Sequence, residues 1–204
     1  MNTLKAEKRS MDVKAKKLRR EGFVTGNVFG REMEGSLPVK MQKSDVERLL
    51  KTDHKGSQIM LNVDGKDYDV LIKEIQYNSM AARVDEIDFQ ALVSDEKVNS
   101  VAEVILENHD KVAEGVVQLL VSEIPYKAYP ADLVDSVKID VGQMHVGDSV
   151  KVKELEIAKN SRIEIAEDPE AAVVVVSAVH NTVPAEETEE TEETEETEET
   201  EEEA

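Results

Sequence analysis

The sequence contains no cysteine among its 204 residues, and it has no long hydrophobic run. Without cysteine, disulfide bonds and thiolate chemistry are excluded, and a reducing cytosolic setting is the natural expectation. The longest apolar run, residues 171–176, is far too short to span a bilayer, and the first ten residues lack the apolar stretch of a secretion signal. We therefore expect a soluble, non-secreted, cytoplasmic protein that makes no membrane contact.

Catalytic and metal-binding motifs are also missing. The sequence has no P-loop, no GxGxxG and no GxSxG, and its acidic clusters lack the EF-hand pattern. Its histidines are scattered without metal-ligand spacing, at His54, His109, His145 and His180. The sequence therefore predicts a protein that is not an enzyme, with no cofactor, no metal and no small-molecule substrate.

The charge is distributed very unevenly along the chain. The formal net charge is -20, yet residues 1–31 hold nine Lys or Arg against three Asp or Glu. Residues 92–185 hold eight basic and 17 acidic residues, and residues 186–203 add thirteen Glu. The front of the chain can therefore meet a polyanion, whereas the back half repels one.

The strongest concentration of positive charge lies between Arg9 and Gly30. Six cations fall within twelve residues against the single acid Asp12, namely Arg9, Lys14, Lys16, Lys17, Arg19 and Arg20. A helix over residues 14–20 would have only Leu18 to anchor it, so it is either marginally stable or completed by something that it binds. A run of lysines can also be only a solvated face. The glycine-punctuated strand that follows, with an exposed-type aromatic residue at Phe29, favours RNA or DNA as the ligand.

Residues 1–92 read as strands with one or two short helices. A strand over residues 24–29 is interrupted by Gly26 and Asn27, which indicates either a bulge or a close approach of another backbone. Asp64-Gly65 is a strong two-residue hairpin signal between strands at 58–63 and 68–75. Ser44, with Glu47 three residues later, has the spacing of a capping box at the start of a short helix.

The second half is rich in valine. Strands are expected over residues 98–107, 112–121, 136–141, 149–156, 162–165 and 172–179, at the spacing typical of an all-β sandwich or barrel. The EET repeats have no hydrophobic content with which to offset ordering entropy, so a disordered tail is expected. The predicted organisation is one domain over 1–92, a β-rich domain over 93–182 and a Glu/Thr-rich tail over 183–204.

Several motifs resemble one known family. Residues 16–30 read KKLRREGFVTGNVFG, similar to the signature LRxxGxVPAVxYG of the bacterial large-subunit ribosomal protein that binds 5S rRNA, in its two-domain form named for the general stress protein CTC. Further matches follow in the family's order: DGKDYDVLIKEIQYN, EIDFQAL, YPADL, IDVGQMHVGDSVKVKELEI and EDPEAAVVVVSAV. The resemblance covers residues 1–180, and several weak motifs in order are more specific than any one of them.

The resemblance implies an N-terminal β-barrel with short helices on 5S rRNA and a β-rich C-terminal domain against other parts of the ribosome, including neighbouring ribosomal proteins. Arg9, Lys14, Lys16, Lys17 and Arg19 would contact phosphates and sugars, with Arg20 beside them. Phe29 and Gly30 stand where the family has Tyr-Gly at the RNA surface. Gln76 and Asp88 match polar positions that face the RNA.

Four positions depart from the family pattern. Val24-Thr25-Gly26 replaces the family's Val-Pro-Ala, Phe29 replaces its tyrosine, Ser79 replaces its proline, and Glu86 stands where the family has histidine. A carboxylate that faces phosphate is unfavourable, so either Glu86 points away from the RNA or the affinity is weaker than usual in the family.

We therefore expect a structural ribosomal protein that binds 5S rRNA in the large subunit and is tied to stress conditions. One alternative is an acidic protein-interaction module, in which the C-terminal domain and the tail carry the function and the basic stretch only pairs with the tail. Another is a tRNA-binding barrel, which rests on similarity to the anticodon-binding barrels of glutaminyl-type synthetases.

Overall fold

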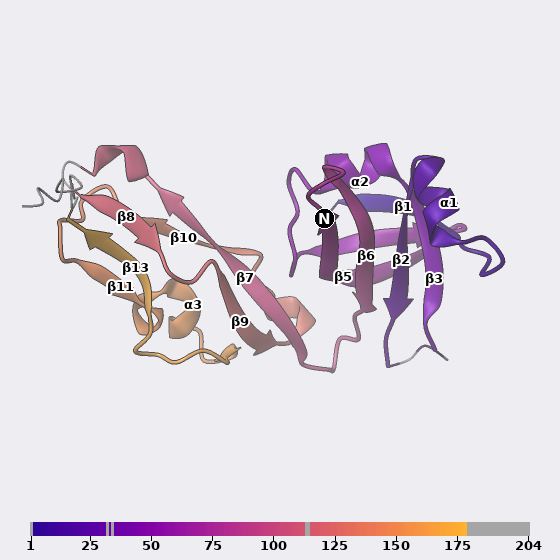
Figure 1. Cartoon of the computed structure of the whole chain (residues 1–204). Coiled ribbons are helices and arrows are strands. Elements are labelled where there is room, and N and C mark those ends of the chain that lie inside the picture. Colours follow the sequence, from indigo (N-terminus) through magenta and orange to yellow (C-terminus); the bar gives the residue numbers. More distant parts are fainter. Residues whose placement is uncertain (1, 32, 34, 113–114, 179–204) are drawn as a thin grey trace, which may run out of the picture.

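The computed structural model describes residues 2–31, 33, 35–112 and 115–178. Its first half is a closed six-stranded barrel with two short helices (Figure 1). Along the chain, one helix precedes the second strand and the other follows the third. The elements are β1 (Thr3–Lys8), α1 (Ala15–Arg20), β2 (Phe23–Phe29), β3 (Leu37–Gln42), α2 (Lys43–Leu49), β4 (Gln58–Val63), β5 (Lys66–Asn78) and β6 (Arg83–Ala91).

The barrel strands follow the order β1-β3-β2-β6-β5-β4. Antiparallel pairs form most of the ladder, while β2 pairs with β6, and β1 with β4, in parallel. Val63 pairs with Lys66 across Asp64-Gly65, which confirms the predicted hairpin. Because β2 and β6 are neighbours, side chains about 60 positions apart in the sequence share one outer surface.

The barrel interior is filled by the apolar side chains that alternate along each strand. On β6, Ile87 and Phe89 are fully buried, and on β2 Val24 and Val28 are buried. Each large aliphatic or aromatic side chain buried in this way contributes about 1.5–3 kcal/mol relative to exposure. The alternation turns the intervening residues of β2 and β6 outward, toward the surface that carries the charged side chains.

Gly26 marks a close approach between β2 and β6, and the predicted alternative of a bulge at this point is wrong. Gly26 pairs in regular register with Ile87, and a Cβ atom at Gly26 would lie 2.0 Å from the Ile87 backbone oxygen. The bulge occurs on the partner strand, because Gln76 pairs with Glu86 while Tyr77 pairs with Val84, which leaves Asp85 as an extra residue in β6.

Both helices lie at one end of the barrel (Figure 1). α1 has one buried side chain, Leu18, as its sequence predicted, and α2 buries Val46 and Leu49. The Lys43 amide donates to the Gly22 backbone oxygen at 3.0 Å and so ties the start of α2 to the end of α1. The predicted capping box is wrong: α2 begins at Lys43, and its N-cap residue Gln42 makes no side-chain cap.

The second half has its own hydrophobic core between two sheets. Strands β7 (Val98–Glu107), β9 (Glu123–Ala128), β10 (Ser136–Asp140) and β12 (Glu164–Ile165) form one sheet in the order β10-β7-β9-β12. Strands β8 (Val116–Leu119), β11 (Ser149–Lys151) and β13 (Ala172–Ser177) form the other. We call residues 98–177 the C-terminal unit. The mainly β prediction is confirmed for both halves.

Short helical turns replace some of the strands expected in the C-terminal unit. These turns are η1 (His109–Lys111), η2 (Pro130–Asp132), η3 (Val152–Glu154) and α3 (Glu156–Lys159). The predicted strand over 149–156 therefore ends at Lys151, and the one over 162–165 shortens to Glu164–Ile165. The expected disordered tail, 183–204, lies outside the described residues.

The barrel contacts the C-terminal unit through the loop that precedes β4. Lys55 pairs with Glu123 at 2.7 Å, and the Ser100 hydroxyl donates to the Gly56 backbone oxygen at 3.2 Å. Next to this loop, the Lys73 ammonium donates to the Asn99 backbone oxygen at 2.8 Å. Among the helices of the described residues, none is long and apolar enough to cross a membrane.

Candidate nucleic-acid interface

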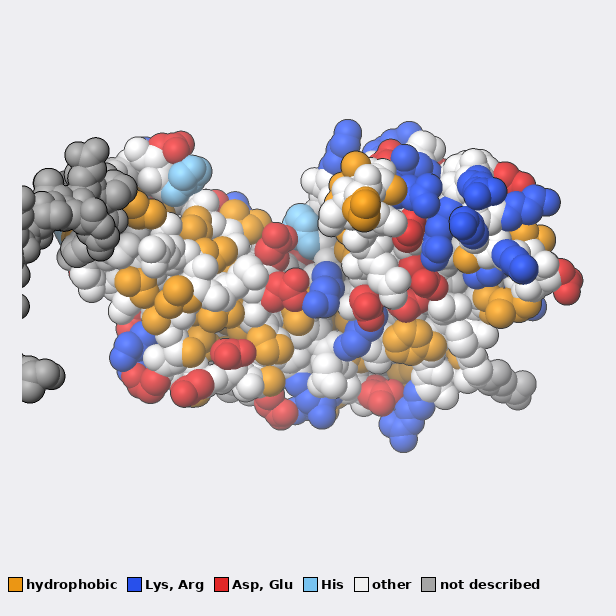
Figure 2. All heavy atoms as spheres, viewed as in Figure 1, with side chains coloured by type: hydrophobic (Ala, Val, Ile, Leu, Met, Phe, Trp, Pro, Cys, Tyr) orange, Lys and Arg blue, Asp and Glu red, His pale blue; other side chains and the backbone are white. Residues whose placement is uncertain are grey.

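The exposed cations of the basic stretch gather on α1 and the residue before it. Lys14, Lys16, Lys17 and Arg20 are all exposed, and we call them the α1 cations. Within the described residues, Lys17 alone of the four has a carboxylate within 4 Å, at 3.9 Å from Glu21, and both side chains are largely exposed. Such a surface pair is worth little. Figure 2 shows Lys and Arg side chains clustered around this end of the barrel and few on the visible face of the C-terminal unit.

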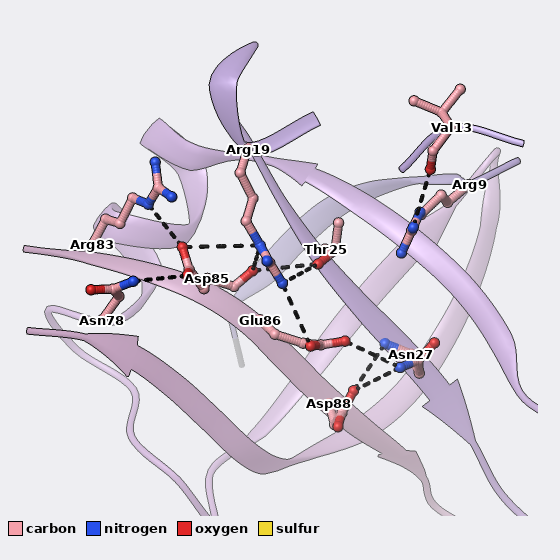
Figure 3. Close-up of polar contacts among 10 residues, drawn as sticks. All are labelled: Arg9, Val13, Arg19, Thr25, Asn27, Asn78, Arg83, Asp85, Glu86 and Asp88. Atoms are coloured by element: carbon pink, nitrogen blue, oxygen red, sulfur yellow. Dashed lines mark hydrogen bonds and ion pairs between the residues drawn. The ribbon is translucent and has the colours of Figure 1, made fainter. Parts of the chain in front are cut away.

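Arg9 lies apart from the α1 cations and is partly buried. Its Nη2 donates to the Val13 backbone oxygen at 3.1 Å, while its Nε is buried without a hydrogen-bond partner among the described residues. Arg9 therefore holds the loop that leads into α1, and part of its guanidinium is already committed to the protein (Figure 3).

Arg19 points back onto the barrel wall (Figure 3), whereas the α1 cations are exposed. Its Nε donates to the Asp85 backbone oxygen at 3.0 Å, and its Nη2 lies 3.5 Å from the Thr25 hydroxyl. The same Nη2 is 3.7 Å from the Glu86 carboxylate, and the side chain is only 22% exposed. Arg19 therefore gives α1 a polar anchor beside the apolar contact of Leu18.

Glu86 and Asp88 face outward on β6, and Asn27 of β2 bridges them. The Asn27 side-chain amide lies 3.5 Å from Glu86 Oε1 and 3.2 Å from Asp88 Oδ1, and the Asn27 backbone amide also donates to Asp88 Oδ1 at 3.2 Å. Glu86 thus does not point away from the surface that carries α1. Its charge is offset within the protein by Arg19 and Asn27.

Asp85, the extra residue of the β6 bulge, is the centre of a second polar cluster. Its carboxylate accepts from Arg83 Nε at 2.8 Å and from the Asn78 amide at 3.2 Å, with Arg19 Nε 4.0 Å away. The hydrogen bond from Asn78, the hydrogen bond from Arg83 and the charges of Arg83 and Arg19 hold the pKa of Asp85 below its ordinary value, against the opposing effect of burial. The bulge thus places the Asp85 backbone oxygen against Arg19 of α1 and its carboxylate against Arg83 and Asn78.

We predict that Asp85→Asn lowers the free energy of unfolding by about 1–3 kcal/mol at pH 7, since hydrogen bonds to an ionised group are lost. A carboxyl whose pKa is lower in the folded state stabilises the fold above its unfolded pKa, and this stabilisation is lost as the pH falls through the folded value. The difference in unfolding free energy between variant and parent should therefore stay constant above about pH 5 and shrink in stronger acid. Urea unfolding at pH values above and below about 5 measures this difference. A difference that does not change with pH would contradict a lowered pKa of Asp85.

The remaining predicted site residues lie further along the same barrel wall. Asp88 pairs with Asn27 and with Glu74, and Gln76 is exposed on β5 opposite Glu86. Phe29 is 38% exposed at the far end of β2, and Gly30 follows it against Ala91. At about 3.3 Å a residue, Phe29 is roughly 20 Å from the start of β2 beside α1. The candidate interface is therefore a strip that runs down the barrel from α1 to Phe29.

Sequence reasoning missed Asn27, Asn78, Arg83 and Asp85 as parts of this surface. Asparagine is unfavourable in the middle of a strand, so its presence at position 27 could have indicated a polar contact there. The bulge that places Asp85 depends on the β5–β6 pairing, and no local pattern marks it.

A cleft of about 740 Å³ lies between α2, β5 and the C-terminal unit. Its lining balances the cations Arg48, Lys51, Lys55 and Arg83 against the acids Glu47, Asp53, Glu103 and Glu123. This mixture of charges does not favour a polyanion. Among the described residues, no group of three His or carboxylate side chains could hold a metal ion.

Comparison with known proteins gives matches along almost the whole chain. Residues 4–89 match the model of the ribosomal L25p family, and residues 97–180 match that of the C-terminal domain of ribosomal protein TL5. A large ribosomal subunit protein bL25 from Carboxydothermus hydrogenoformans is 31% identical over 190 residues, which cover 89% of this chain and 94% of the relative.

Two further relatives carry the same name. The protein from Thermosipho africanus is 30% identical, with 92% of this chain and 90% of the relative covered. The protein from Moorella thermoacetica is 28% identical, with 85% and 86% covered. The chain therefore belongs to the bL25 family of ribosomal proteins, which confirms both the resemblance and the prediction of a structural, non-enzymatic protein.

Proposed function

We propose that the protein binds 5S rRNA in the large ribosomal subunit through the α1 cations and the barrel wall beneath them. The observation that carries this proposal is the cluster of four exposed cations on α1 and the residue before it, in a chain of net charge -20; α1 itself has a single buried side chain. Like charges this close repel one another unless a counter-charge arrives. Phosphates supply that counter-charge, and the gain in affinity comes from released counterions.

The barrel wall supplies the second part of the proposed interface. Below α1, the side chains of Asn27, Gln76 and Asp88 present amide and carboxylate groups on three neighbouring strands, with Phe29 and Gly30 at the far end. A-form RNA is recognised through its backbone, its 2′-hydroxyls and the edges of its bases in the shallow groove. Hydrogen-bonding groups on a rigid sheet suit that surface, while the α1 cations fix the position of the backbone.

The proposal divides the chain into three parts. Residues 1–92 form the RNA-binding domain, residues 93–182 form a domain that contacts neighbouring ribosomal proteins, and residues 183–204 form an acidic tail. The excess of acidic residues over residues 92–185 supports protein contacts there over RNA contacts. A ribosome-associated protein of this kind works in the cytoplasm. The link to stress conditions stays a prediction.

Titration of the purified protein with 5S rRNA over a range of salt concentrations tests the proposal. We expect tighter binding to 5S rRNA than to a tRNA or to an unrelated RNA of similar length. Lys16→Ala should reduce the slope of log affinity against log salt by about 0.7–0.9, since one phosphate contact is lost.

Lys159→Ala is the matched control, because Lys159 is an exposed lysine on α3 of the C-terminal unit. It should leave the slope unchanged. Equal affinity for all three RNAs would contradict 5S binding, and tighter binding of the tRNA would favour the tRNA-binding alternative.

A further inference from the structure

We propose that Arg19 is a positioning residue that serves as the internal counterion of Glu86, and is not a phosphate ligand. The inference rests on the proposed function, because it assigns roles within the same interface. It separates Arg19 from the α1 cations, with which the sequence grouped it.

The contacts of Arg19 are those of a side chain committed to the protein. One edge of the guanidinium, Nε with Nη2, is occupied by the Asp85 backbone oxygen, the Thr25 hydroxyl and the Glu86 carboxylate. The Asp85 carboxylate also lies 4.0 Å from Nε, but Arg83 pairs with it at 2.8 Å, so Glu86 is the carboxylate that depends on Arg19. At 22% exposure, Arg19 is far less accessible than Lys17, whose side chain is 70% exposed. The arginine therefore points along the barrel wall, while the α1 cations point to solvent.

Glu86 is the group that needs this counterion. Its side chain is 25% exposed on the outward face of β6, next to Asp88 and opposite Gln76. An uncompensated carboxylate in that place would repel the phosphates that the α1 cations attract. With Arg19 on Oε2 and Asn27 on Oε1, Glu86 keeps a defined orientation and little net field. Glu86 then stands in the RNA surface as a neutralised hydrogen-bond acceptor.

Two other roles for Arg19 make different predictions. A direct phosphate contact would lose the same affinity whether or not Glu86 is charged. A purely mechanical anchor for α1 would act through the Asp85 backbone oxygen, which does not depend on the Glu86 charge either. Only the counterion role makes the effect of Arg19 depend on Glu86.

A double-mutant cycle in 5S rRNA binding tests the pair, with Arg19→Gln, Glu86→Gln and the double variant, which has the net charge of the parent. We expect Arg19→Gln alone to weaken binding about tenfold, because it leaves the Glu86 carboxylate without a counter-charge beside the RNA phosphates. Glu86→Gln alone should bind more tightly than the parent. In the Glu86→Gln background, Arg19→Gln should change the affinity by less than about twofold. The double variant should also keep the parent's slope of log affinity against log salt.

Arg20→Gln is the matched control, because it removes the same charge from the adjacent, exposed side chain of α1. Arg20→Gln should reduce the salt slope by about 0.7–0.9 both in the parent and in the Glu86→Gln background. An equal loss from Arg19→Gln in both backgrounds, or Glu86→Gln binding no better than the parent, overturns the counterion role.

The same four proteins test the pair without RNA. In thermal unfolding, the loss from Arg19→Gln should be smaller once Glu86 is already Gln, and strictly additive losses would overturn the inference. A failure of the proposed function can be told apart from a failure of this inference. If the proposed function is wrong, the parent protein shows no preference for 5S rRNA, whether or not Arg19 and Glu86 are coupled in thermal unfolding.

Discussion

Replacing Lys14, Lys16, Lys17 and Arg20 together with glutamine is expected to weaken 5S rRNA binding roughly a thousandfold at 0.1 M salt. Each phosphate contact contributes about 0.7–0.9 to the salt slope, and so about 0.7–0.9 log units of affinity at 0.1 M relative to 1 M salt. Four contacts then amount to about three log units. The affinities of variant and parent should converge as the salt concentration approaches 1 M, which filter binding or fluorescence titration can follow.

The fourfold variant should still fold, because all four side chains are exposed and Leu18 and Arg19 still hold α1 on the barrel. The control carries the same change of charge on exposed lysines of the C-terminal unit: Lys111, Lys127, Lys138 and Lys159. It should bind 5S rRNA within about threefold of the parent, since charges more than a Debye length from the RNA are screened. Equal losses in the two variants would show that net charge, and not the α1 surface, governs binding.

Much of the fold could be predicted because its signals are local. The strand over 98–107 is observed with the predicted bounds, and Asp64-Gly65 forms the expected hairpin. The strand predicted over 149–156 ends early because Val152 and Leu155 are both buried at a spacing of three residues. That spacing puts two side chains on one face of a helical turn but on opposite faces of a strand.

The candidate site also has one part that the sequence predicts and one part that depends on the fold. The α1 cations follow from charge and from the lack of an apolar face, so the sequence suffices to predict them. The pairing of Arg19 with Glu86 joins positions 67 residues apart and depends on the parallel register of β2 with β6, in which Thr25 stands opposite Glu86. No alternation or turn signal encodes that register, and the role of Arg19 therefore emerges only from the folded chain.

Replacing Gly56 with alanine is expected to separate the barrel from the C-terminal unit while both remain folded. A Cβ at Gly56 would lie 2.1 Å from the Val101 backbone oxygen, and the Gly56 φ of +92° is itself unfavourable for alanine. The obstructing atom is backbone on β7, so it cannot rotate aside. The contacts around the loop would then be lost together, among them Lys55–Glu123 and the hydrogen bond from Ser100 to Gly56.

Each half keeps its own hydrophobic core in this variant, because Gly56 belongs to neither. We therefore expect a larger radius of gyration in X-ray scattering, two separate transitions in calorimetry and faster trypsin cleavage after Lys97. Binding of 5S rRNA should stay within about twofold, since α1 lies outside the junction. Gly65→Ala is the matched control, because its φ of +88° carries the same backbone strain while nothing lies within 4 Å of the added Cβ. If both variants keep the radius of gyration of the parent, the contacts through Gly56 do not fix the arrangement of the two halves.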